Sequence, residues 1–201
     1  MTQVPHQNDL AALLGSRICH DLISPIGAIG NGLELLMMDL GAKSPEVALI
    51  AQSVAHANAR IRFFRLAYGA VGAEARQNLA EVRSILSDLT QGSRLGIEWA
   101  TSADLARAGV KAAFLLIQCL ESAMPYGGKI VVSEKDDRWL IEAVAQRLKV
   151  DADLWGMLAD PGATPDISPA VVHFPLAAAE IARQGRRLTA DLGQTSIRLS
   201  F

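Results

Sequence analysis

The sequence has no long apolar run and no basic leader. Its longest apolar stretch, around residues 112–117, is far shorter than the roughly 20 residues that cross a bilayer. The first ten residues lack both the basic and the apolar segment of a secretory signal. We therefore expect a cytoplasmic protein with no membrane partner.

Cysteine and net charge are equally scarce. Cys19 and Cys119 are far apart, and each is isolated in an apolar helical pattern. Without a CxxC-type pair, the sequence favours buried reduced thiols over a disulfide or a metal site. A formal net charge of -2 provides no general attraction to nucleic acid. We expect no nucleic-acid partner and no metal or cofactor of its own.

Two long helical patterns open the chain. The first runs from about Asn8 to Leu40 and ends at Gly41, and the second begins at Ser44 and Pro45 and reaches residue 69 or 72. The short connection predicts an antiparallel hairpin. Two helices alone bury too little apolar surface, so we expect a homodimer in which two hairpins form a four-helix bundle.

From about residue 73 the pattern mixes helices with strands. Helices are expected at 78–90, from 103 or 104 to 124, and at 174–184, with strands at 95–100, 129–134, 139–144, 187–192 and 195–201. Residues 151–168 are typical of a loop around one short helix. These elements predict an α+β fold: an α/β sandwich with a mostly antiparallel sheet and helices on one face. We expect domains at 1–74 and 75–201.

A helical wheel of the first helix separates an apolar stripe from a polar face. With about 100° per residue, the stripe is centred on Ile18 and is expected to be buried near the core of the dimer interface. It comprises Ile18, Leu22, Ile29, Leu33, Leu36 and Leu40. His20 falls near 200°, opposite the stripe. Its face also carries Arg17, Ser24, Gly27 and Asn31.

The residues around His20 point to a functional site. Asp21 follows directly, and Ser24 lies one turn further on. Pro25 inside an apolar helix costs about 3 kcal/mol, which points to a functional reason for keeping it. Gly27 and the two glycines that follow it would let another backbone approach, although helix packing explains them equally well.

His20–Ile29, with the sequence HDLISPIGAI, resembles the H-box of bacterial sensor histidine kinases. The resemblance implies that His20 is phosphorylated, that Asp21 orients or deprotonates it, and that Ser24 occupies the position involved in hydrolysis. The chemistry agrees, because imidazole titrates near neutral pH and one ring nitrogen can act as a nucleophile.

The second half resembles the ATP-binding domain of the same kinases, with its motifs damaged. LLIQCLESAMPYGG resembles the nucleotide-binding helix, but Cys119 stands where those kinases have the asparagine that holds magnesium. No Asp-x-Gly-x-Gly motif follows, and His173, Phe174 and Pro175 replace the last glycine-rich box. Bulky side chains and a missing backbone donor exclude phosphate there, which predicts that no ATP is bound.

An intact H-box hairpin joined to a damaged ATPase domain resembles the ChpT-type histidine phosphotransferases. The resemblance implies a homodimer that accepts phosphoryl from the receiver domain of a hybrid histidine kinase and delivers it to response regulators. The partner's aspartate site would supply the magnesium. Arg17 would contact the phosphoryl group or the partner, and Gly27 and Asn31 lie on the same docking face.

Two alternatives remain open at this point. One is an ATP-dependent histidine kinase, against which the missing asparagine and glycine boxes speak. The other is a dimeric adaptor that binds receivers without passing phosphoryl, against which the complete H-box speaks.

Overall fold

The computed structural model describes residues 7–39, 44–72, 74–101, 104–159 and 168–201. The chain divides into two compact units, Met1–Ala70 and Val71–Phe201. The expected cap at Gly41, the helix start at residue 103 and most of the expected loop after residue 159 lie outside the described residues.

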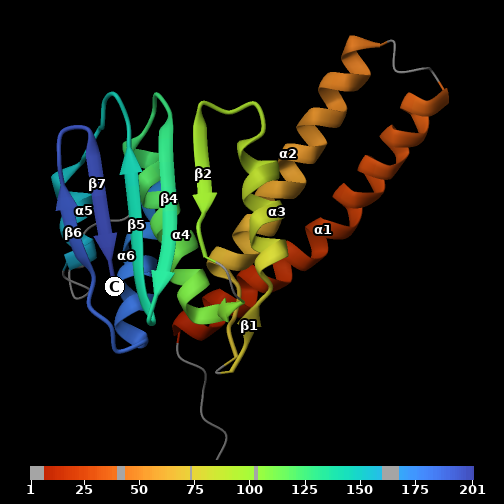
Figure 1. Ribbon diagram of the computed structural model, residues 1–201. Coiled ribbons are helices and arrows are strands. Elements are labelled where there is room, and N and C mark those ends of the chain that lie inside the picture. The colour runs from red at the N-terminus through yellow and green to blue at the C-terminus, as the bar shows by residue number, and fades with distance from the viewer. Residues whose placement is uncertain (1–6, 40–43, 73, 102–103, 160–167) are drawn as a thin grey trace, which may run out of the picture. The chain divides into compact units, whose positions relative to one another are not determined.

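The first unit is the expected antiparallel hairpin (Figure 1). Helix α1 spans Gln7–Asp39 and continues through Pro25. Helix α2 spans Pro45–Tyr68, and the Ser44 hydroxyl caps it by accepting from the Val47 amide at 3.4 Å. Proline at the first helical position loses no hydrogen bond, because that amide has no intrahelical partner. The capping signal therefore predicts this helix start correctly.

Small residues set the distance between the two helices. A Cβ on Gly15 would lie 3.3 Å from Tyr68 Cβ, and one on Gly30 would lie 3.7 Å from Val54 Cγ1. Between these two glycines Cys19 is only 6% exposed. The face of α1 that meets α2 is therefore centred on Cys19, one residue away from the predicted stripe.

The second unit contains a five-stranded sheet of order β2-β4-β5-β7-β6. Its strands are β2 (Leu95–Trp99), β4 (Gly128–Lys135), β5 (Arg138–Val144), β6 (Thr189–Leu192) and β7 (Ser196–Ser200). Only β2 and β4 pair in parallel; the other three pairings are antiparallel. The expectation of a mostly antiparallel sheet is confirmed.

Helices cover one face of this sheet (Figure 1). They are α3 (Leu79–Thr90), α4 (Arg107–Ala123), α5 (Ala152–Ala159) and α6 (His173–Arg183), with a 3-10 turn at Pro169–Val171. α4 is buried along almost its whole length and forms the centre of the unit. The opposite sheet face carries exposed ion pairs, Lys129 to Glu98 at 2.7 Å and Arg198 to Glu142 at 2.8 Å.

One small element differs from expectation. Leu105–Ala106 forms strand β3, which pairs with strand β1 at Arg76–Gln77, so α4 begins at Arg107 and not at 103 or 104. The Asp104 carboxylate accepts from the Leu79 amide at 2.8 Å, at the start of α3. Two-residue strands carry too little alternation to be recognised in a sequence.

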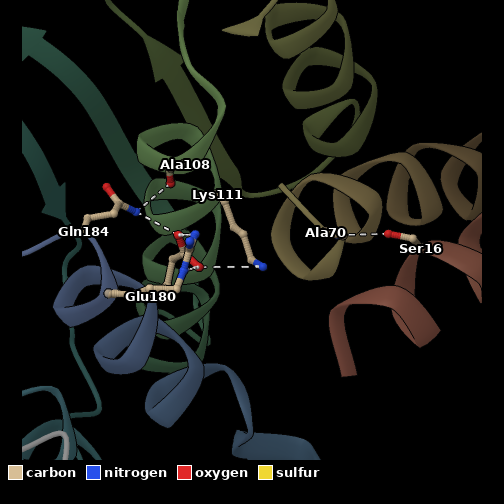
Figure 2. Close-up of polar contacts among 7 residues, drawn as sticks. Ser16, Ala70, Ala108, Lys111, Glu180 and Gln184 are labelled. Carbon is tan, nitrogen blue, oxygen red and sulfur yellow. Dashed lines mark hydrogen bonds and ion pairs between the residues drawn. The ribbon is translucent and has the colours of Figure 1, made fainter. Parts of the chain in front are cut away.

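A buried carboxylate joins α4 to α6 (Figure 2). Glu180 is 6% exposed and accepts from Arg183 Nη2 at 2.7 Å and from Gln184 Nε2 at 2.9 Å, while Lys111 Nζ lies 3.7 Å away. Gln184 also donates to the Ala108 carbonyl at 2.9 Å. A buried charge is tolerable only with such partners, so this cluster fixes how the two helices pack.

His173 and Phe174 begin α6 inside the same layer. His173 Nε2 lies 3.1 Å from the Ser122 hydroxyl of α4, and burial lowers the pKa of His173 below its usual 6.5. The Phe174 ring packs edge-on against Trp155 of α5, with centroids 5.7 Å apart. Ring and imidazole thus fill the space between three helices.

We predict that Gly109→Ala destabilises the second unit by about 1–3 kcal/mol, the usual cost of overpacking. The new Cβ would lie 2.7 Å from Trp139 Nε1, and Trp139 is itself only 2% exposed. The control is Gly156→Ala in α5, where a Cβ meets nothing within 4 Å. Urea denaturation should give equal or higher stability for this control; equal losses in both variants would contradict the argument.

We also predict that the second unit loses stability as the pH falls below about 6.5. Burial lowers the pKa of His173, so the unfolded chain binds its proton first and acid favours unfolding. This stabilisation is complete above the usual pKa and declines below it. The difference between urea midpoints at pH 7.5 and 5.5 should shrink in His173→Gln and stay unchanged in the exposed control His56→Gln.

Candidate functional site

His20 lies near the middle of α1 on an open face. Its side chain is 81% exposed, whereas the preceding residue, Cys19, is buried at 6%. Consecutive helical residues point about 100° apart, so a helix that buries Cys19 against α2 must turn His20 outward. The predicted exposure of His20 is met by this geometry.

Three charged or titratable side chains meet on this face. Asp21 Oδ1 lies 3.1 Å from His20 Nδ1, and Asp21 Oδ2 accepts from Arg17 Nε at 2.8 Å. The hydrogen bond with His20, and then the one from Arg17, lower the pKa of Asp21. The carboxylate is therefore ionised at neutral pH and shared between the imidazole and the guanidinium.

This contact decides which imidazole nitrogen can react. An ionised carboxylate only accepts hydrogen bonds, so the arrangement assigns the hydrogen to His20 Nδ1. Nε2 of the neutral ring then keeps its lone pair and is the nitrogen available to act as a nucleophile. The geometry suits attack on an electrophile that approaches from outside the hairpin.

The remaining predicted site residues lie further along the same face. Ser24 and Asn31 are exposed, and Gly27 is half-buried. A Cβ on Gly27 would meet nothing within 4 Å, nor would one on Gly32. Against the described residues Gly27 and Gly32 therefore serve no close approach, and of the three glycines that follow His20 on this helix Gly30 alone faces α2.

The apolar stripe predicted to be buried is exposed in the single chain. Ile18, Leu22, Ile29 and Leu36 are 49%, 44%, 49% and 43% exposed. Leu33 is half-buried, and Leu40 lies outside the described residues. Within one hairpin α2 covers the neighbouring face, about 100° away around the helix, so the stripe stays open and its expected burial in a dimer interface stays a prediction.

Residues one turn before His20 pack more tightly than the sequence indicated. The Ser16 hydroxyl accepts from the Ala70 amide at 2.9 Å (Figure 2). A Cβ on Gly69 would lie 2.4 Å from the Arg65 carbonyl and 3.3 Å from Ser16 Oγ. The small pair at Gly15 and Ser16 was the available signal for this contact, and it fixes α1 next to the end of α2.

The helix that resembles a nucleotide-binding element holds no available metal ligand at the key position. Cys119 is fully buried, and desolvation raises its thiol pKa well above 9.0. The turn after α4 has a structural need for glycine: Gly127 has φ +89°, and a Cβ there would lie 2.4 Å from the Arg94 carbonyl. The backbone therefore requires glycine at position 127 whether or not a nucleotide binds.

The residues that the structure describes contain neither a membrane-spanning helix nor a metal-binding cluster. No helix among them is both long and apolar enough to span a bilayer. Within the same residues, no group of three or more His, Cys, Asp or Glu side chains could hold a metal ion.

Comparison with known proteins assigns the family. The profile of the histidine phosphotransferase C-terminal domain matches residues 79–196. The protein phosphotransferase ChpT of Brucella abortus (strain 2308) is 36% identical over 148 residues, which cover 71% of this chain and 70% of that protein. A solved structure of a bacterial phosphotransferase is 27% identical, covers 98% of both chains and has a TM-score of 0.67. The chain belongs to the histidine phosphotransferase family.

Proposed function

We propose that this chain carries phosphoryl on His20, accepting it from an aspartyl phosphate in the receiver domain of a hybrid histidine kinase and passing it to response regulators. Family membership makes the protein a phosphotransferase of two-component phosphorelays; the residue and the route are the proposal. The observation that carries it is the exposed His20 with the Asp21 carboxylate on Nδ1.

The roles of the neighbouring residues follow from their positions. Asp21 orients the imidazole and balances its positive charge after attack. Ser24, one turn away, is the residue we assign to hydrolysis of the phosphohistidine. Arg17, Gly27 and Asn31 share the exposed face that a receiver would meet. The partner supplies the magnesium with its own aspartate site.

We further propose that the chain acts as a cytoplasmic homodimer. The exposed stripe of Ile18, Leu22, Ile29 and Leu36 lies on a hairpin whose other apolar face α2 already covers. A second hairpin is the natural cover, because equivalent stripes pack into a four-helix bundle. Residues 1–74 would then dimerise and transfer phosphoryl, and 75–201 would form the degenerate ATPase-like domain. Free thiols at Cys19 and Cys119 suit the cytoplasm.

We predict that His20→Ala abolishes phosphoryl acceptance and leaves the fold and oligomeric state unchanged. The side chain is 81% exposed and packs in no core, so only chemistry is lost. The assay mixes the protein with a receiver domain phosphorylated on aspartate, in magnesium, and follows acid-labile label on the protein. His56→Ala, an exposed histidine on α2, is the control and should retain full labelling.

The same assay separates the rival functions. A non-catalytic adaptor would bind the receiver without becoming labelled, and retention of label in His20→Ala would assign the site elsewhere. Radiolabelled ATP offered alone should give no label and no rise in melting temperature, because binding to the native state stabilises it by mass action. Labelling by ATP would identify a kinase.

We predict that Ile29→Glu separates or unfolds the dimer. The charge would be buried against an apolar surface without a partner, which is strongly unfavourable. The control is Met38→Glu on the same helix, about 180° from the stripe and 79% exposed. Light scattering should report a smaller mass for Ile29→Glu only. A monomeric wild-type protein, or a dimer that survives Ile29→Glu, would contradict the assembly.

A further inference from the structure

Arg17 lies where it can control the carboxylate next to His20. Neighbouring helical residues point about 100° apart, so Asp21 does not face His20 by position alone. Arg17 precedes Asp21 by one turn, and on the wheel it falls between Asp21 and His20. Its Nε donates to Asp21 Oδ2 at 2.8 Å, while the other oxygen, Oδ1, lies 3.1 Å from His20 Nδ1.

We propose that Arg17 is a positioning residue for phosphoryl transfer: it holds the Asp21 carboxylate against His20 Nδ1, so that Nε2 is the nucleophile. The proposal rests on His20 being the phosphorylated residue. It assigns to Arg17 a role inside this chain, distinct from the contact with the phosphoryl group or the partner that the sequence suggests.

The Arg17–Asp21 ion pair is exposed, which favours a role in the reactivity of His20 over a role in the stability of the fold. The Arg17 and Asp21 side chains are 74% and 50% exposed. Water and salt screen exposed ion pairs, so this one contributes little to folding. What Arg17 does change is the direction of a carboxylate that would otherwise sample several rotamers in water.

A carboxylate directed at His20 Nδ1 serves both directions of phosphoryl transfer. The Nε2 lone pair attacks phosphorus in the partner's aspartyl phosphate, the P–O bond to the aspartate breaks, and its electron pair leaves with the carboxylate. Nδ1 keeps its proton throughout, so the phosphorylated ring is cationic and Asp21 balances its charge. In the onward step an acceptor carboxylate attacks phosphorus and Nε2 leaves with the electron pair. Both directions use the same Nδ1 hydrogen bond.

The first test is spectroscopic and uses the full-length, unphosphorylated protein. Nitrogen-15 NMR of the neutral His20 ring should report mainly the Nδ1–H tautomer in the wild type. In Arg17→Gln the population should shift toward the Nε2–H tautomer, because the carboxylate is released. The matched control is Arg138→Gln, an exposed arginine at the start of β5, which should leave the His20 signals unchanged. Identical tautomer populations in the wild type and Arg17→Gln would overturn the proposal.

The second test is a double-mutant cycle on the transfer rate at saturating phosphorylated receiver. Arg17→Gln should slow acceptance by roughly tenfold, less than the roughly hundredfold that a 1 Å misplacement of a reacting group can cost, because Asp21 itself remains. If Arg17 acts through Asp21, adding Arg17→Gln to Asp21→Asn should cost less than about twofold more. Two outcomes would mean that Arg17 contacts the phosphoryl group or the partner instead. In one, the rate losses of Arg17→Gln and Asp21→Asn multiply in the double variant. In the other, Arg17→Gln raises the receiver concentration needed for half the maximal rate and leaves the maximal rate unchanged. An unlabelled wild type would refute phosphotransfer at His20 itself, a result separate from any effect of Arg17.

Discussion

The first unit depends on one constraint: α1 carries three different surfaces at fixed angles around its axis. One helix presents three surfaces: a face around Cys19 that α2 covers, an exposed apolar stripe around Ile18 and Ile29, and the face of His20. These surfaces are separated by the 100° step between consecutive residues, so none can be moved without moving the others. Covering the stripe with a second hairpin would leave His20 on the outside of the bundle, which is what access by a partner domain requires.

The second unit is organised around α4, which is buried along most of its length. α4 presents Gly109 to Trp139, Ser122 to His173 and Ala108 to Gln184. The Gln184 side chain donates to the Ala108 backbone carbonyl, and the thiol of Cys119 is completely enclosed. Around α4 the interior is closely packed, with aromatic rings on the sheet side and the hydrogen-bonded Glu180 carboxylate on the α6 side.

Local signals explain how much could be predicted from the sequence. Ser44–Pro45 predicted the start of α2, and the Asp136–Asp137 turn between β4 and β5 has the two positive φ angles typical of a tight hairpin. The faces of α1 could not be assigned in the same way, because Cys19, Ile23 and Ile26 are as apolar as the predicted stripe. Only the position of α2 decides between the two faces. Likewise, the helical wheel grouped Arg17 with His20. That one Asp21 oxygen contacts Arg17 and the other contacts His20 depends on side-chain rotamers, which the wheel does not give.

An exposed site of this kind places a physical requirement on its hydrogen bonds. Against the described residues the His20 side chain is 81% exposed, so the imidazole is oriented without the help of a low-dielectric pocket. In the proposed mechanism the orientation comes from neighbours on the same helix, through the contacts of Arg17 with Asp21 and of Asp21 with His20. Desolvation would follow only when a partner covers the face. The carboxylate contact, weak while exposed, would strengthen at that moment, because the same charges interact more strongly once water is removed.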